Sequence, residues 1–313
     1  MTPPTVDLPA RPEAPEPHRR AGPIARAAEA VPPAALVMVS VVSIQLGAAV
    51  AVNLFEALGP IATTFLRVTF SAVLLLVATR GHIGAGARRH VGLLLLFGCV
   101  IGAMNMSFYG AIARIPLGVA VAIEFIGPLG VAAITSRRPR DFVWIGFAVA
   151  GLVLLTPDIG GDLDPLGVGL ALLAGAGWAS FVLISPRVAR GVGTAGLALA
   201  MAVASLVTLP FGLAAGGLER LEPGLLAGAL AVAILSTALP LSLEFEALRR
   251  MTARAYGILV TLEPVTAALV GALVLGQALP PTAVAAIACV TVAAIGVTLS
   301  DRRGAVVVPP TSG

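Results

Sequence analysis

Apolar and polar residues fall in long blocks along this chain. Ten apolar segments of 15 to 22 residues are separated by short stretches that hold most of the charged residues. A helix of about 20 residues is about 30 Å long, which matches the hydrocarbon core of a bilayer. The pattern therefore predicts an all-α membrane protein with ten transmembrane helices, over residues 34–52, 59–79, 91–112, 117–136, 142–156, 166–185, 194–214, 225–245, 254–275 and 281–300.

The polar stretches divide the ten segments into two groups of five. Residues 1–32 are rich in Pro, Ala and Arg and have no apolar periodicity, so we expect a disordered tail. Residues 157–165 form an acidic loop that carries Asp158, Asp162 and Asp164. We therefore expect two five-helix units, 33–156 and 166–300, followed by a second tail over 301–313.

Composition supports a membrane protein and excludes a nucleic-acid partner. The chain is 58% hydrophobic and 12% charged, whereas soluble proteins carry about 25% charged residues. All 20 basic residues are arginine. They lie singly or in small groups between apolar segments and form no nucleic-acid-binding motif. We read them as signals of orientation in the bilayer.

The arginines give the orientation. If the N-terminus is cytoplasmic, seventeen of the 20 arginines fall in cytoplasmic segments, and only Arg114 and Arg220 fall outside. The remaining arginine, Arg67, lies within a helix. Cytoplasmic segments of membrane proteins carry an excess of positive residues. The sequence therefore predicts that both termini are cytoplasmic.

The two groups of five segments are weakly related in sequence. An offset of 136 residues places Tyr109 on Phe245, Arg114 on Arg250 and Pro128 on Pro264, and a slightly longer offset places Gly151 on Gly296. Because five is odd, the two units would cross the membrane in opposite directions. Inverted repeats of this kind are typical of secondary transporters, whose sites lie near the midplane between the repeats.

Several blocks carry a family resemblance, most specifically those around Glu124 and Glu263. They resemble the EamA family of the drug/metabolite transporter superfamily, and within it the threonine and homoserine exporters of bacterial inner membranes. The resemblance implies ten helices in an inverted repeat and export of small amino acids by proton antiport with alternating access. Other small metabolites on the same fold stay open as substrates. The blocks are residues 43–49, 102–132, 136–144, 175–183 and 231–264.

Charged residues inside the predicted helices are the candidate site. Arg67 and Glu124 lie eight and seven residues from the outer ends of their segments, which puts both about 11 Å below the outer boundary. Glu263 lies near the midplane, and Glu244 near the cytoplasmic end. Charges at such depth are costly and usually functional. The matching depths allow an ion pair between Arg67 and Glu124, either as part of the site or as a permanent structural pair.

The roles follow from the chemistry of each group. Burial favours the neutral form of a carboxyl group, so Glu124 or Glu263 would exchange a proton for the ammonium group of a substrate. Arg67 would hold the substrate carboxylate. The amides Gln45 and Asn105 would line the site, or else only link helices. Glu244 and Tyr256 are candidates for a gate, and Tyr109 and Tyr256 also fit interfacial anchors.

Other function classes lack their residues. His18, His82 and His90 all lie outside the predicted helices and lack metal-ligand spacing, so we expect no metal and no cofactor. A membrane-embedded enzyme would need paired aspartates, a metal helix or a Ser–His pair within the helices. A channel would need a filter-like stretch. A transporter is favoured, with a monomer and a dimer both compatible.

Overall fold

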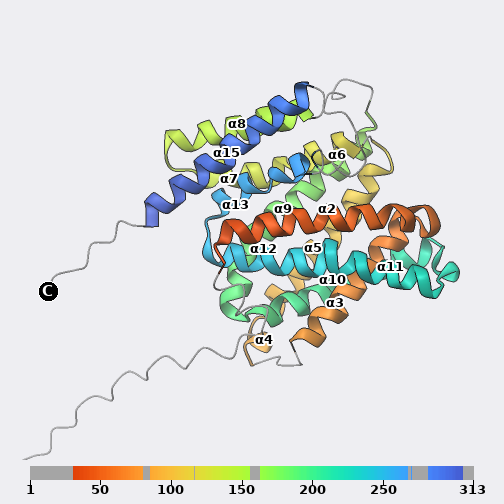
Figure 1. Cartoon of the computed structure of the whole chain (residues 1–313). Helices are drawn as coiled ribbons and strands as arrows, with labels where there is room; N and C mark the ends of the chain where they lie inside the picture. Colours follow the sequence, from red (N-terminus) through yellow and green to blue (C-terminus); the bar gives the residue numbers. More distant parts are fainter. Residues whose placement is uncertain are drawn as a thin grey trace, which may run out of the picture.

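The computed structural model describes residues 31–79, 85–115, 117–155, 163–266, 269 and 281–305, and every regular element in these ranges is helical. This confirms the all-α prediction. Most of the two tails and of the acidic loop lies outside the described residues. The helices are α2 (Pro33–Leu58), α3 (Pro60–Ala78), α4 (Ala85–Arg89), α5 (Val91–Ile112), α6 (Leu117–Glu124), α7 (Ile126–Thr135), α8 (Pro139–Leu155), α9 (Pro165–Gly191), α10 (Thr194–Ala214), α11 (Pro223–Ala233), α12 (Leu239–Arg250), α13 (Ala253–Leu259) and α15 (Pro281–Ala305) (Figure 1).

Proline fixes where many of these helices begin. Proline lacks an N–H group, and the first N–H groups of a helix have no partner within it, so proline is favoured at the first helical position. The helices that begin at a proline are α2, α3, α8, α9, α11 and α15. The boundary prolines of the sequence thus mark the ends of the apolar segments.

Five helical stretches in the described part of the chain are long and apolar enough to cross a membrane. They are Pro60–Ala78, Val91–Ile112, Pro165–Gly191, Thr194–Ala214 and Pro223–Arg250. Shorter apolar helices occur over Pro33–Gly47, Val119–Thr135 and Val284–Val297. The architecture is that of a helical membrane protein.

Three of the ten predicted segments are interrupted. The fourth is divided into α6 and α7 by a turn at Phe125. The eighth combines α11 and α12 through a π-helical turn, η2 (Ile234–Ala238). The ninth begins with α13 and resumes over residues 262–266 after a turn. Sequence periodicity predicted continuous helices here, and the interruptions lie beside the candidate site.

The helices pack in pairs that join the first five segments to the last five. In Figure 1, α2 lies against α12, and α8 lies against α15. The pairs α3 with α10, α5 with α9 and α7 with α13 are also in contact. Small residues permit this close approach: a Cβ on Gly98 of α5 would lie 2.5 Å from the carbonyl oxygen of Ala200 on α10.

Large apolar side chains cover the outside of the bundle. Ile134 is 87% exposed, Val77 69% and Leu206 67%. Soluble monomers rarely expose extensive apolar surface. This surface therefore suits contact with lipid.

Candidate functional site

The two central acids lie at matching helix breaks. Glu124 is the last residue of α6, and Glu263 follows the turn after α13. Proline cannot donate the hydrogen bond that a helix directs to the carbonyl four residues earlier. Pro128 and Pro264 therefore withhold a donor from the carbonyl groups of Glu124 and Val260. The Val260 carbonyl instead accepts a bond from Glu263 N, at 2.9 Å, and the helix is broken there.

Glycines bring α9 against the break at Glu124. A methyl group on Gly127 would collide with the backbone of Gly175 on α9. A Cβ on Gly175 would lie 2.8 Å from the carbonyl oxygen of Glu124. The Glu124 backbone is thus fixed against α9, and the side chain is only partly buried.

Arg67 on α3 is held by α5. Its Nη2 atom donates to Asn105 Oδ1 at 2.6 Å, and Asn105 Nδ2 donates to the carbonyl of Ile101 at 2.8 Å. The guanidinium carbon also lies 5.6 Å from the centre of the Tyr109 ring, a distance typical of cation–π contacts. Asn105 therefore orients the guanidinium group of Arg67.

The ion pair that matching depths allow between Arg67 and Glu124 is not formed among the described residues, where no nitrogen of Arg67 lies within 4.0 Å of a carboxylate. Arg67 and Glu124 were placed at the same depth in the membrane, but depth does not determine the direction in which a side chain leaves its helix. Glu124 still lies close enough to Arg67 and Glu263 for their charges to act on it. Arg67, Glu124 and Glu263 therefore form one neighbourhood, with the Arg67 Nε atom lacking a described hydrogen-bond partner.

Gln45 reaches this neighbourhood from α2. Its Nε2 atom donates to the backbone carbonyl of Glu263 at 3.4 Å. The bond connects α2 to the helix that carries the acid. Gln45 thus contacts the backbone of Glu263 through its amide nitrogen, and this bond does not use the amide oxygen of Gln45.

Glu244 and Tyr256 form a buried hydrogen-bonded network. Glu244 Oε1 accepts a bond from the Ser40 hydroxyl at 2.6 Å, and Oε2 accepts one from the Tyr256 hydroxyl at 2.7 Å. Trp178 Nε1 donates to the same tyrosine oxygen at 3.3 Å. Tyr256 is fully buried, so the interfacial-anchor reading of Tyr256 is wrong. The network joins α2, α9, α12 and α13 through two candidate gate residues.

The π-helical turn is stabilised by a serine of α2. Leu239 N–H bonds to the carbonyl of Ile234, five residues earlier. In the same five-residue spacing, the carbonyl of Leu235 would accept a bond from residue 240, but Pro240 has no N–H group. The Ser43 hydroxyl donates to the carbonyl of Leu235 at 2.6 Å instead. π turns are frequent at functional sites, and Pro240 was the sequence signal for this one.

Replacing Ser43 with alanine is expected to destabilise the fold by about 1 kcal/mol, because the Leu235 carbonyl would lose its donor. Thermal unfolding in detergent measures the loss. Ser180→Ala is the matched control, since the Ser180 hydroxyl is exposed and bonds within its own helix. Equal melting temperatures for the two variants would contradict the role of Ser43.

The sequence analysis named the charged residues and some of their polar partners as candidates, but it missed two members of the network around Glu244. Ser40 and Trp178 were not expected in the network of Glu244, because a lone serine or tryptophan in an apolar segment gives no directional signal. No group of three metal-ligating side chains occurs among the described residues. The site is thus built from two acids, a guanidinium group, amides and hydroxyls.

Comparison with known proteins gives the family. The model of the EamA-like transporter family matches residues 165–299. The threonine/homoserine exporter RhtA of Escherichia coli K12 is 40% identical over 274 residues, which cover 87% of this chain and 92% of the exporter. The chain belongs to the EamA-like transporter family. RhtA of Salmonella typhimurium LT2 is 39% identical over the same length.

A solved crystal structure shares the fold. It superposes with a TM-score of 0.74 at 18% identity, covering 87% of this chain and 98% of that chain. At this identity the likeness concerns the fold alone. EamA membership confirms the resemblance seen in the sequence and makes this chain a membrane transporter.

Proposed function

We propose that this EamA protein exports small amino acids of the threonine and homoserine type across a bacterial inner membrane by proton antiport. Ten helices in two inverted repeats, 33–156 and 166–300, would alternate access to a site between them, with both termini cytoplasmic. The observation that carries the proposal is the pair of acids, Glu124 and Glu263, at proline-induced breaks beside Arg67. Discontinuous helices near the midplane are typical of substrate and ion sites in transporters.

Contacts between equivalent residues support the inverted repeat. The hydroxyls of Thr69 on α3 and Ser205 on α10 lie 2.7 Å apart and are separated by 136 residues, the offset that aligns the two halves. A residue that touches its own equivalent lies on a two-fold axis. A two-fold axis between α3 and α10 accounts for this pair.

Reciprocal contacts between α8 and α15 give independent support. A methyl group on Gly151 would collide with Val290, and one on Gly296 would collide with Trp144. The longer offset places Gly151 on Gly296 and Trp144 close to Val290. Each contact is therefore the two-fold copy of the other, as in an interface between identical surfaces.

The matched arginines make equivalent contacts as well. Arg114 lies 3.6 Å from Asp164, directly before α9, and Arg250 donates to the carbonyl of Val31, just before α2, at 3.0 Å. Arg114 lies two residues after α5, Arg250 is the last residue of α12, and each reaches the start of the other half. These polar contacts at the two ends of the bundle support the proposed repeat.

The transport cycle follows from the groups in the site. An amino acid from the cytoplasm would place its ammonium group on Glu124 or Glu263, which releases its proton to the cytoplasm. The substrate carboxylate would bind the guanidinium group that Asn105 orients. After the site opens outward, the amino acid leaves and an external proton returns to the acid. Charge pairing in a low-dielectric site makes these exchanges favourable.

A counterflow screen with purified protein in liposomes tests the substrate. Liposomes loaded with one amino acid are diluted into the same labelled compound, and threonine and homoserine are compared with other amino acids and common metabolites. Accumulation of labelled threonine or homoserine supports the proposal. Accumulation of only other metabolites would replace the substrate while retaining the transporter class.

Arg67→Lys is expected to raise the half-saturating concentration of threonine about tenfold, because lysine cannot form the forked bonds of a guanidinium group. Initial export rates over a range of internal threonine concentrations measure it. Arg220→Lys is the control, since Arg220 lies outside the predicted helices. An unchanged half-saturation in Arg67→Lys would remove Arg67 from the substrate site.

A further inference from the structure

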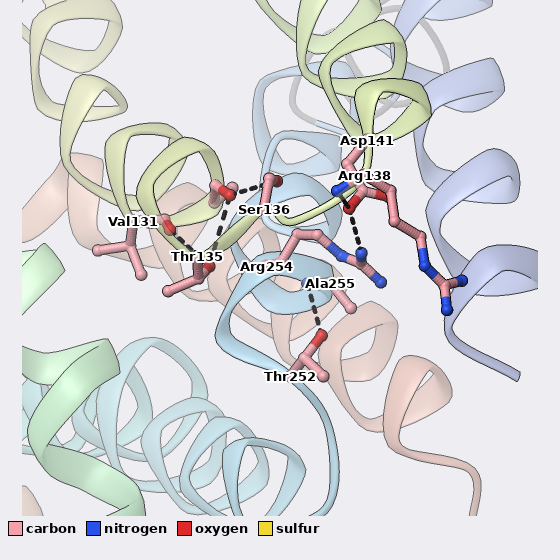
Figure 2. Close-up of polar contacts among 9 residues, drawn as sticks. Val131, Thr135, Ser136, Arg138, Asp141, Thr252, Arg254 and Ala255 are labelled. Carbon is pink, nitrogen blue, oxygen red and sulfur yellow. Dashed lines mark hydrogen bonds and ion pairs between the residues drawn. The ribbon is translucent and has the colours of Figure 1, made fainter. Parts of the chain in front are cut away.

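A second cluster of charged groups holds the start of α13, away from the acids of the site. Arg254 Nη1 lies 2.6 Å from Asp141 Oδ2, and the backbone N–H of Arg138 donates to the same oxygen at 3.3 Å. The Thr252 hydroxyl accepts a bond from Ala255 N and caps the helix. Figure 2 shows Asp141 at the start of α8 and Arg254 at the start of α13 facing each other.

The ion pair is buried although it joins two helix ends. The side chain of Asp141 is 1% exposed and that of Arg254 15%. Asp141 Oδ1 is also buried, without a hydrogen-bond partner among the described residues. A buried pair gains little over apolar packing, and less when its remaining oxygen is unsatisfied. The pair therefore suits a contact that must open rather than one that only stabilises.

The ion pair joins the two halves of the chain, and one of its members, Arg254, lies on the helix that leads to the site. Asp141 lies in the first turn of α8, the last helix of the first half, and Arg254 lies at the start of α13 in the second half. Two residues after Arg254, Tyr256 contributes its hydroxyl to Glu244, and Glu263 follows the break. Movement of the start of α13 would therefore reach both Glu244 and Glu263.

Among the residues that the structure describes, this arrangement has no counterpart at the other end. The offset of 136 residues places Gly118 at the position of Arg254, so the repeat supplies no cation at the equivalent external position. The external ion pair between Arg114 and Asp164 has side chains that are 40% and 42% exposed. Exposed pairs contribute little. The ion pairs that the structure describes at the two ends of the molecule are thus unequal in burial.

We propose that Asp141 and Arg254 are positioning residues that form a cytoplasmic latch, which holds α13 closed over the site and opens when substrate enters from the cytoplasm. This rests on the proposed function for its direction. The latch favours the state closed to the cytoplasm. Removing it increases the fraction of molecules that are open to the cytoplasm.

The test uses Asp141→Asn, Arg254→Gln and the double variant in the full chain. Each single variant leaves one buried group unpaired, whereas the double variant removes both charges and leaves two neutral amides. The double variant therefore restores folding but stays unlatched. Arg114→Gln is the control, because it breaks the external, exposed pair.

The first readout needs no substrate. Hydrogen exchange of the peptide that covers 251–259, in lipid nanodiscs, is expected to be several-fold faster in the double variant than in the wild type. Exchange in Arg114→Gln is expected to match the wild type there. Unchanged exchange in a folded double variant would overturn the latch, whatever the substrate is.

The second readout separates a latch from general loosening. Half-saturation by threonine is measured from each face, in inside-out and right-side-out vesicles. The unlatched double variant is expected to show about tenfold lower half-saturation from the cytoplasmic face and no decrease from the external face, because only the open fraction binds. A parallel rise on both faces, or no change on either, would overturn the latch. Faster hydrogen exchange in a protein that transports no amino acid would reject the substrate proposal, but the latch proposal would stand.

Discussion

Glu124→Gln is expected to lower the initial rate of proton-coupled threonine export by at least about 100-fold. Glutamine cannot release a proton, and it has no negative charge with which to bind an ammonium group. The two side chains have nearly the same shape, so the protein should reach the membrane and fold. Proteoliposomes with an imposed pH gradient and internal labelled threonine measure the rate.

Glu222→Gln is the matched control for this change, since Glu222 is an exposed acid at the start of α11. Its export rate should equal that of the wild type. Normal exchange of threonine for protons by Glu124→Gln would show that Glu124 is only structural. The proton-carrying role would then pass to Glu263.

Gly127→Ala is expected to have the largest effect on folding. The added methyl group would collide with the Gly175 backbone, and two helix backbones cannot yield as a flexible side chain can. Overpacking of a tight core typically costs about 1–3 kcal/mol, and here it would also displace Glu124. Thermal unfolding in detergent and the export rate should both decrease.

Gly130→Ala separates this collision from the general effect of adding a methyl group to α7. A Cβ on Gly130 meets nothing within 4 Å. This variant should retain the melting temperature and transport of the wild type. If both variants behave alike, close packing of α7 on α9 is not what positions Glu124.

The helices could be predicted from the sequence because their signal is local. Blocks of apolar residues placed most helix ends within a few residues, as for α3 and α10. The breaks were missed because apolar periodicity continues through them. Pro128 and Pro264 were the available signals. Each lacks the N–H group that would bond to the carbonyl four residues earlier in a continuous helix.

The site was predicted in part, for a different physical reason. Depth follows from counting residues, so the sequence could place the charged residues within the helices, and their roles in the site stay predictions. The direction in which a side chain leaves its helix depends on how the helices pack, and contacts such as that of Gly127 with Gly175 decide this packing. The ion pair that matching depths allowed between Arg67 and Glu124 is therefore not formed, and Arg67 instead donates to Asn105. Tyr256 was misread as an anchor because sequence position near a helix end does not report burial.

The hydroxyl contact between Thr69 and Ser205 has a consequence for motion. In the proposed cycle the two halves exchange conformations, which turns every contact into its two-fold copy. A contact between equivalent residues is its own copy. It should therefore persist in both states and act as the pivot about which the bundles rock, a fixed reference for distance measurements between labelled helices.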